Sequence, residues 1–188
     1  MIGVVLAGGL SRRFRGLAKG LQLFNGVPLA LHAARAVAPL CSRVVIECVR
    51  DSGYEALGLP LVHASSEHAG KGPLAGMAAG LELATGVGKV AFVPCDMPLL
   101  TPGMYERLAR EPFGSYAMSP MGAEPLVCVL KGQALPDVER LLVGQSVPGV
   151  LALFEAIRAV AVAFDDPSAF LNVNTPEDLS DLNARNSR

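Results

Sequence analysis

The stretch that decides the fold is residues 2–13, which read Ile2-Gly3-Val4-Val5-Leu6-Ala7-Gly8-Gly9-Leu10-Ser11-Arg12-Arg13. Its first five residues form a short apolar run that is typical of a buried strand. The run leads into paired glycines, and because glycine has no Cβ, backbone N–H groups there can come close to a ligand. Such N–H groups form a concave anion site, and the arginines together with Lys19 add positive charge. We therefore predict a loop that binds a polyphosphate.

The spacing of this loop differs from the two commonest phosphate-binding motifs. A Walker A loop needs Ser or Thr after its lysine, whereas Gly20 follows Lys19 here. The dinucleotide fingerprint Gly-x-Gly-x-x-Gly is broken by the adjacent Gly8 and Gly9. The alternative interpretation is an ordinary strand-to-helix turn with solvated arginines, so the prediction depends on what the rest of the chain adds.

The composition of the chain favours one globular domain. Its 188 residues are 51% apolar and 18% charged, which is enough to bury a sizeable core. The net charge of −1 provides no overall field for nucleic acid or an anionic membrane, so neither is expected as a partner. The four cysteines lack metal-ligand spacing, which indicates buried thiols in a reducing compartment. The N-terminus carries no leader signal and no apolar run is long enough to span a membrane, so we expect a cytoplasmic protein.

Strand-like and helix-like segments alternate along the chain. Continuous apolar strands between amphipathic helices predict an α/β fold: a single Rossmann-like domain over residues 1–184, with a mostly parallel central sheet and helices on both faces. Residues 185–188 are expected to form a frayed tail. The expected strands are 2–6, 43–49, 60–63, 89–94, 115–119, 125–130 and 159–164, and the expected helices are 28–38, 74–84, 102–110, 132–143, 147–157 and one that starts at Thr175-Pro176.

Asp96 is the candidate metal ligand. It follows the strand expected at 89–94, within Pro94-Cys95-Asp96-Met97-Pro98, where the prolines stiffen the backbone. Ligands of open α/β sheets bind at the carboxyl ends of the strands, so Asp96 and Gly8-Gly9 are expected at the same edge. Mg²⁺ is usually held by one or two carboxylates together with substrate phosphates and water. The alternative is an aspartate that caps a turn.

Two further segments precede expected helices. The segment Gly70-Lys71-Gly72-Pro73-Leu74-Ala75-Gly76 offers free N–H groups that suit an anion, although a flexible loop with close helix packing gives the same pattern. Asn172 and Asn174 stand just before a capped helix and share one side of the chain if the backbone is extended. They suit a substrate or a hydrated metal, and helix capping explains them equally well.

Taken in order, these segments resemble the molybdenum cofactor guanylyltransferase family, within the glycosyltransferase-A-like nucleotidyltransferases. The resemblance covers residues 2 to about 182, and although sister nucleotidyltransferases share single segments, the set is specific. It rests on Val4-Val5-Leu6-Ala7-Gly8-Gly9, Arg12-Arg13, Lys19, Gly72-Pro73-Leu74-Ala75-Gly76, Pro94-Cys95-Asp96-x-Pro98, Glu124-Pro125-Leu126 and Asn172-x-Asn174-Thr175-Pro176-Glu177.

The resemblance implies a reaction in which a molybdopterin phosphate attacks the α-phosphate of GTP, magnesium assists and pyrophosphate leaves. A transient protein partner that delivers the pterin is left open. The residues implied are Arg13, Lys19 and Asp96 for catalysis, with Asp96 on magnesium; Leu6, Ala7, Gly8, Gly9, Lys19 and Asp96 for the nucleotide; and Gly72, Pro73, Leu74, Gly76, Asn172 and Asn174 for the second substrate.

The departures from the family pattern lie mostly on the side of the base. Ala18 stands where the family usually has aspartate, Glu47 where it has asparagine, and Ala64 or Ser65 where it has an aspartate linked to guanine recognition. We therefore expect Glu47, which ends a strand at the ligand edge, to contact the nucleotide. The alternatives are a nucleotidyltransferase that uses another base or acceptor, such as CTP or a sugar or alcohol phosphate, and a nucleotide-binding regulator without turnover.

Overall fold

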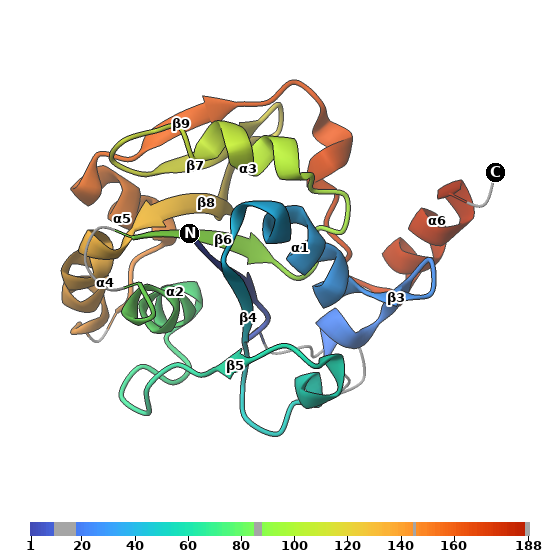
Figure 1. Ribbon diagram of the computed structural model, residues 1–188, viewed down its shortest axis with the longest axis horizontal. Helices are drawn as coiled ribbons and strands as arrows, with labels where there is room; N and C mark the ends of the chain where they lie inside the picture. The colour runs from blue at the N-terminus through green and yellow to red at the C-terminus, as the bar shows by residue number, and fades with distance from the viewer. Residues whose placement is uncertain (10–17, 85–87, 145, 187–188) are drawn as a thin grey trace.

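A seven-stranded sheet in the order β5-β4-β1-β6-β8-β7-β9 forms the centre of the molecule (Figure 1). The structure is a computed structural model that describes residues 1–9, 18–84, 88–144 and 146–186. Arg13, one of the expected catalytic residues, lies outside the described residues. The strands are β1 (Ile2–Leu6), β4 (Arg43–Glu47), β5 (Leu61–Val62), β6 (Lys89–Pro94), β7 (Ser115–Ser119), β8 (Gly122–Lys131) and β9 (Val160–Ala163).

The sheet is mostly parallel, as predicted. Strand β1 is parallel to β4 and β6, β5 is parallel to β4, and β9 is parallel to β7. Strand β8 is antiparallel to both of its neighbours, with Phe92 paired to Cys128. Counting on from this pair places Leu126 level with Pro94. The beginning of β8 therefore reaches the same edge of the sheet as the carboxyl ends of the parallel strands.

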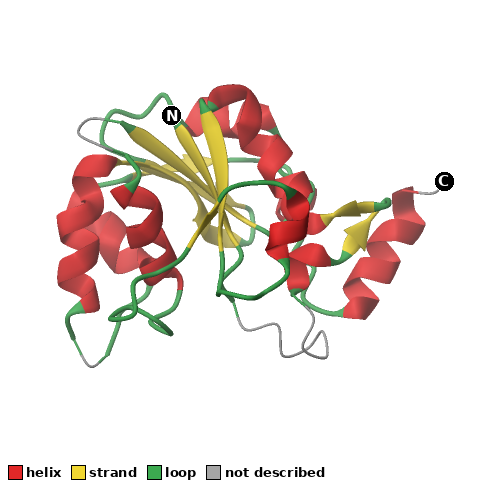
Figure 2. Ribbon diagram, turned by 60° about the horizontal axis from the view of Figure 1, so that its bottom comes forward, coloured by secondary structure: helices red, strands yellow, loops and turns green. Residues whose placement is uncertain are grey.

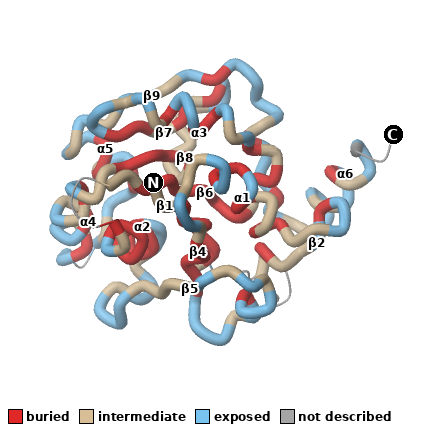
Figure 3. Tube along the Cα trace, viewed as in Figure 1, coloured by how far each residue is buried: buried red, intermediate tan, exposed pale blue. Residues whose placement is uncertain are grey.

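Helices cover both faces of the sheet, which confirms the predicted fold class (Figure 2). Because side chains alternate along a strand, Val5 packs with α1 (Leu29–Val37) and α3 (Pro102–Leu108), whereas Val4 and Leu6 pack with the helices of the opposite face. Figure 3 shows that the burial is concentrated in the central strands and in the helix sides that face them. The opposite face carries α2 (Pro73–Glu82), α4 (Leu135–Leu142) and α5 (Val150–Ile157).

A small hairpin stands beside the last helix, apart from the main sheet (Figure 1). It joins β2 (Leu23–Phe24) to β3 (Val27–Pro28) through Asn25 and Gly26, whose φ angles are +48° and +74°. Asn-Gly is the preferred pair for a hairpin turn with positive φ at both positions, and the sequence analysis missed this signal. The hairpin and α6 (Pro176–Asn186) enclose a small core of Phe24, Leu29, Val173 and Leu182.

The other differences from the sequence predictions concern the ends of elements. Pro28 pairs with Leu23 in β3, so α1 begins one residue later than expected. Thr101 precedes α3 as predicted, but its side chain caps no backbone N–H. Helix α5 begins at Val150, which leaves residues 147–149 in the preceding loop. The short 3₁₀ helices are η2 (Lys19–Leu21), η3 (Ala38–Leu40), η4 (Tyr54–Leu57), η5 (Gly132–Ala134) and η6 (Pro167–Phe170).

The last helix, the apolar helices and the cysteines bear on three of the sequence predictions. Arg185 belongs to α6, and residues 187–188 lie outside the described part of the chain. Among the helices that the structure describes, none is long and apolar enough to cross a membrane. The cysteines are all free thiols, and Cys48, Cys95 and Cys128 are buried as expected.

Candidate active site

The carboxyl ends of β1, β4 and β6 open into one cavity of about 900 Å³. This is the edge at which the sequence predicted a ligand, because loops that follow parallel strands meet there. The residues expected to contact the nucleotide all line this cavity: Leu6, Ala7, Gly8, Gly9, Lys19, Glu47 and Asp96. The structure therefore brings these residues together at one cavity, while their roles toward a nucleotide stay predictions.

Backbone hydrogen bonds fix the start of the glycine loop. The N–H of Ala7 donates to the Glu47 carbonyl at 2.8 Å, and the N–H of Cys95 donates to the Leu6 carbonyl at 3.1 Å. The backbone hydrogen bonding of β1 with β4 and with β6 thus continues up to the start of the loop. For Gly9, no atom of the described residues beyond its chain neighbours lies within 4 Å of the place where a Cβ would stand. The loop therefore offers its backbone to the cavity from a rigid base.

The carboxyl group of Glu47 is wedged between two glycines from different segments. Its Oε2 would lie 2.8 Å from a Cβ on Gly8 and 2.7 Å from a Cβ on Gly76, so neither position has room for a side chain. Only 7% of Glu47 is exposed, and the residue lines the cavity. Glu47 therefore joins the end of β4, the glycine loop and α2.

Burial raises the pKa of the Glu47 carboxyl above its ordinary value. A hydrogen bond from the backbone N–H of Gly8 and the nearby His63 lower it in part. His63 follows β5, next to the end of β4, and its Nδ1 lies 2.7 Å from the Cys48 carbonyl oxygen. The sequence analysis did not single out His63. What indicates His63 is its position directly after β5, because Val62 of β5 pairs with Glu47 of β4.

Lys19 connects three distant segments at the other end of the cavity. Its Nζ donates to Asp96 Oδ2 at 2.7 Å and to Asn174 Oδ1 at 2.9 Å. The lysine side chain is 17% exposed and the aspartate side chain 23% exposed, so the pair is half-buried and accessible from the cavity. Its position is fixed by η2, where Gly20 packs so closely on Tyr54 that a Cβ would stand 2.6 Å from the phenol oxygen. The candidate phosphate and metal residues thus share one end of the cavity.

The chain matches the model of the MobA-like NTP transferase domain over residues 3–161. It belongs to this family. The molybdenum cofactor guanylyltransferase of Bordetella petrii is 37% identical over 96% of this chain and 95% of the relative. The enzyme of the same name from Rhodobacter capsulatus is 38% identical over 95% of this chain and 92% of the relative.

Solved structures show the same fold. Molybdopterin-guanine dinucleotide biosynthesis protein A from Archaeoglobus fulgidus superposes with a TM-score of 0.76 at 24% identity, over 100% of this chain and 99% of its own. The 4-diphosphocytidyl-2C-methyl-D-erythritol synthase from Anaerococcus prevotii reaches 0.72 at 12% identity, over 100% and 96%. The fold is therefore shared with proteins of another name, and it is the sequence similarity that assigns this chain to the MobA-like transferases.

The base-side departures of this MobA-like chain lie at the cavity wall. Ala64 and Ser65 line the cavity, as does Ser66, and none of these carries a carboxylate. Glu67 is exposed and is not among the residues that line it. The carboxylates at the wall are thus Glu47 and Asp96, at separate strand ends. Cys48, Arg50 and His63 also line this wall and were missed by the sequence analysis.

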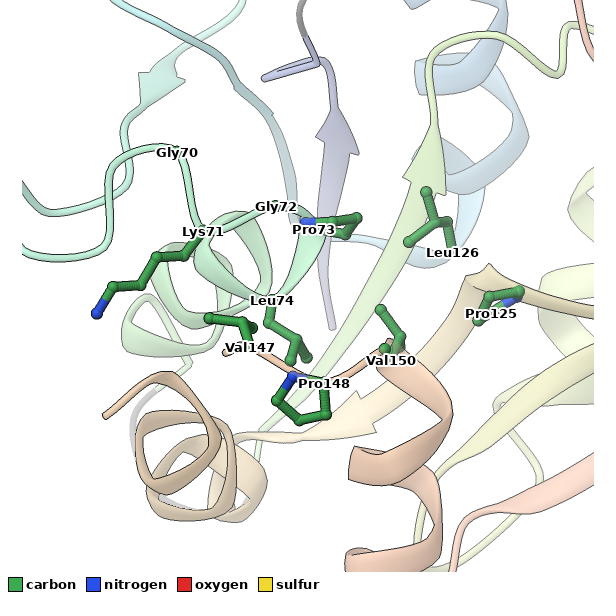
Figure 4. Close-up of a pocket in the computed structure, with 11 residues that line it drawn as sticks. Gly70, Lys71, Gly72, Pro73, Leu74, Pro125, Leu126, Val147, Pro148 and Val150 are labelled. Atoms are coloured by element: carbon green, nitrogen blue, oxygen red, sulfur yellow. The ribbon is translucent and has the colours of Figure 1, made fainter. Parts of the chain in front are cut away.

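The residues expected to bind the second substrate fall into four groups. Gly72 and Pro73 line the main cavity and also a second cavity of about 680 Å³ beside it (Figure 4). Leu74 is buried and lines the second cavity alone, whereas Gly76 lines the main one. Asn172 and Asn174 are exposed, and neither is among the residues that line the two cavities. The structure therefore brings the glycine-rich segment to both cavities and leaves the two asparagines outside their linings.

Asn174 uses its backbone and its side chain for different purposes. Asp178 Oδ2 accepts from the N–H groups of Asn174 and Thr175 at 2.8 Å each, and the Asp178 N–H donates to Thr175 Oγ1 at 3.1 Å. This reciprocal pattern caps α6, and the hydrogen bond from Asn174 is the main reason why the pKa of Asp178 is lowered. Val173, buried between the asparagines, donates to the Asp96 carbonyl at 2.9 Å. The cap thus leaves the Asn174 amide for Lys19.

The donor set at Asp96 suits a hard divalent cation. Its carboxylate is rigidly placed, half-buried and beside the expected position of the phosphates, and Mg²⁺ takes one or two carboxylates with phosphate oxygens. Among the described residues, no three Asp, Glu, His or Cys side chains gather as a metal cage. The site therefore fits a metal that arrives with a polyphosphate rather than one held by protein ligands alone.

Proposed function

We propose that this chain is a magnesium-dependent nucleotidyltransferase that moves GMP from GTP to the phosphate of a molybdopterin, with release of pyrophosphate. The observation that carries the proposal is the cavity in which the glycine loop, Lys19 and Asp96 meet. It supports this reaction in a chain whose relatives, similar over nearly the full length, bear the name molybdenum cofactor guanylyltransferase.

The proposed chemistry is an in-line displacement at phosphorus. An oxygen of the acceptor phosphate forms a bond to the α-phosphorus of GTP, and the bond from that phosphorus to the bridging α–β oxygen breaks, so the electron pair leaves with pyrophosphate. Reactions of this type need positioning and charge neutralisation rather than a nucleophilic side chain. The N–H group of Gly9 orients phosphate oxygens, while the N–H of Gly8 is held by the Glu47 carboxyl and keeps the loop in place. Lys19 balances the charge of the leaving pyrophosphate.

Magnesium, when bound by Asp96, would neutralise the phosphates and polarise the reacting phosphoryl group. Lys19 also has a role before the nucleotide binds. It is paired with Asp96, and when the triphosphate binds, phosphate oxygens would replace Asp96 at the lysine and Asp96 would be left to hold the metal. Asn174 accepts a second hydrogen bond from the lysine amine. The three residues thus form a polar unit that is preorganised for an anionic ligand.

The base is recognised at the opposite end of the cavity in this proposal. Guanine presents N1–H and an exocyclic amine, and a carboxylate accepts from both donors. Glu47 is the carboxylate that lines this part of the wall, in place of one at Ala64 or Ser65. These departures favour a second candidate, in which the enzyme uses CTP or another acceptor, because the guanine-linked aspartate of the family is replaced.

Pyrophosphate release tests the proposal. Purified protein is incubated with GTP, CTP, ATP or UTP, with and without Mg²⁺, in the presence and absence of molybdopterin. We expect release that requires Mg²⁺ and molybdopterin and is fastest with GTP. Fastest release with CTP would support the second candidate, and binding without release from any triphosphate would indicate a regulator. The paired Lys19 and Asp96 count against the regulator.

A further inference from the structure

The cavity of about 680 Å³ beside the nucleotide cavity has walls of a different character. It lies between the N-terminal end of α2, the beginning of β8 and the loop before α5 (Figure 4). Aliphatic side chains dominate its lining: Leu74, Pro125, Leu126, Val147, Pro148 and Val150. This composition suits the faces of a flat ring system, because ligand sites are mainly apolar with few polar groups.

Charge is directed away from this cavity. Lys71 is the one charged residue among those that line it, and its Nζ donates to the Leu142 carbonyl at 2.7 Å. Figure 4 shows the amine pointing away from the apolar side chains. The amine of Lys71 is the cationic group among the described residues of this wall and is held by the Leu142 carbonyl, whereas Lys19 offers its charge in the main cavity. The apolar cavity therefore suits the uncharged part of a ligand.

The two cavities adjoin. They share Gly70, Gly72, Pro73 and Leu126 in their linings, so a molecule that passes over this boundary would reach from the first into the second. Gly72, at the shared boundary, has φ of +71°, and beyond its chain neighbours no atom of the described part of the chain lies within 4 Å of an added Cβ. A ligand whose phosphate reaches the Lys19 and Asp96 end can thus place its remaining part against Pro125 and Val147.

We propose that this apolar cavity, made by the start of β8 and the loop before α5, holds the flat heterocyclic ring of the acceptor while the acceptor's phosphate lies in the nucleotide cavity. The inference rests on the proposed function for the identity of the acceptor as a pterin phosphate. It assigns Pro125, Val147 and Pro148 to the acceptor side, and it leaves Asn172 without a direct contact to the ring.

Val147→Trp tests this assignment, because Val147 lines the apolar cavity and not the nucleotide cavity. Val143→Trp is the matched control: the same residue type, 83% exposed, at the end of α4 and outside both cavities. Gly149→Leu is a second variant, because Gly149 borders the cavity with φ of −67° and open space around an added Cβ. Melting temperatures show whether each variant is folded.

Two measurements are made on each folded variant: steady-state transfer from GTP to molybdopterin, and a fluorescence titration with a pterin phosphate. We expect Val147→Trp and Gly149→Leu to raise the acceptor KM and the pterin Kd at least tenfold, with the KM for GTP within twofold of wild type. Val143→Trp should match wild type. Unchanged acceptor KM and pterin Kd in both folded cavity variants would overturn the inference, as would a loss confined to the KM for GTP.

The outcomes also separate this inference from the proposed function. If the wild-type protein transfers GMP to molybdopterin and the cavity variants behave like the control, the inference is wrong and the function stands. If the wild-type protein transfers nothing but binds the pterin phosphate, and Val147→Trp abolishes that binding, the cavity assignment stands and the function is wrong.

Discussion

Glu47→Gln is the substitution that best separates recognition of the base from support of the glycine loop. Glutamine keeps an oxygen that can accept from the Gly8 N–H, and it fills the same space between Gly8 and Gly76. It removes the negative charge and replaces one acceptor by a donor. If Glu47 reads guanine, the variant leaves N1–H or the exocyclic amine without an acceptor in a largely buried place.

The magnitude follows from the burial. A buried donor that loses its partner costs about 1–3 kcal/mol, which is about 5- to 150-fold in kcat/KM. We expect the loss for GTP to fall in this range, a smaller loss for ITP, which lacks the amine, and little change for CTP. Glu47→Ala should instead weaken all three triphosphates alike, because it also removes the acceptor of the Gly8 N–H.

The assay is pyrophosphate release with GTP, ITP and CTP as competing donors, in wild type, Glu47→Gln and Glu47→Ala. Glu55→Gln, which changes an exposed glutamate outside the cavity, is the control for the substitution itself. A wild-type GTP preference that Glu47→Gln leaves untouched would refute the assignment of the base to the β4 end. A uniform loss with Glu47→Gln would show that the carboxylate serves the loop alone.

Four further predictions concern the polar unit and the buried carboxyl. Asp96→Ala should abolish magnesium-dependent transfer with little change in melting temperature, because such a half-exposed ion pair contributes about 0–1 kcal/mol; near-normal turnover would remove Asp96 from the metal site. Lys19→Ala should weaken the binding of GTP more than that of guanosine, as measured by calorimetry. Asn174→Ala should raise the KM for GTP about 2- to 10-fold, which is the value of one hydrogen bond. Asn172→Ala is its control, and equal effects of the two substitutions would deny Asn174 a role in placing Lys19. The folded-state pKa of Glu47 is raised above 4.5, so its contribution to wild-type stability is fully present below that pH and is lost as the pH rises through the folded pKa. The difference in melting temperature between Glu47→Gln and wild type should therefore shift in favour of the variant over that window. A difference that does not depend on pH would contradict the burial effect.

Much of the fold was predictable because the signals are local. The sequence pattern indicated every strand of the seven-stranded sheet. The rule that ligands bind at carboxyl strand ends then places Gly8, Glu47 and Asp96 at one edge from the sequence alone. The Asn25-Gly26 hairpin was also encoded locally and was overlooked, because its strands are only two residues long.

The contacts that refine the site were not predictable from one sequence. Lys19 and Asn174 are 155 positions apart, and they meet because the hairpin and α6 enclose Val173 in their small core. The wedging of Glu47 between Gly8 and Gly76 needs three segments to pack together, so the glycines appear as flexible positions in the sequence and as crowded ones in the structure. The apolar cavity likewise depends on α5 beginning three residues later than its sequence suggested.

The most direct test of the central claim is identification of the product by mass spectrometry. Wild-type protein is incubated with Mg²⁺, molybdopterin and GTP labelled with ¹⁸O at the non-bridging oxygens of the α-phosphate. The account predicts a pterin–guanine dinucleotide that carries the labelled phosphate, together with unlabelled pyrophosphate, and no product from Asp96→Ala. Labelled GMP without a pterin adduct, or a dinucleotide formed equally well by Asp96→Ala, would contradict it.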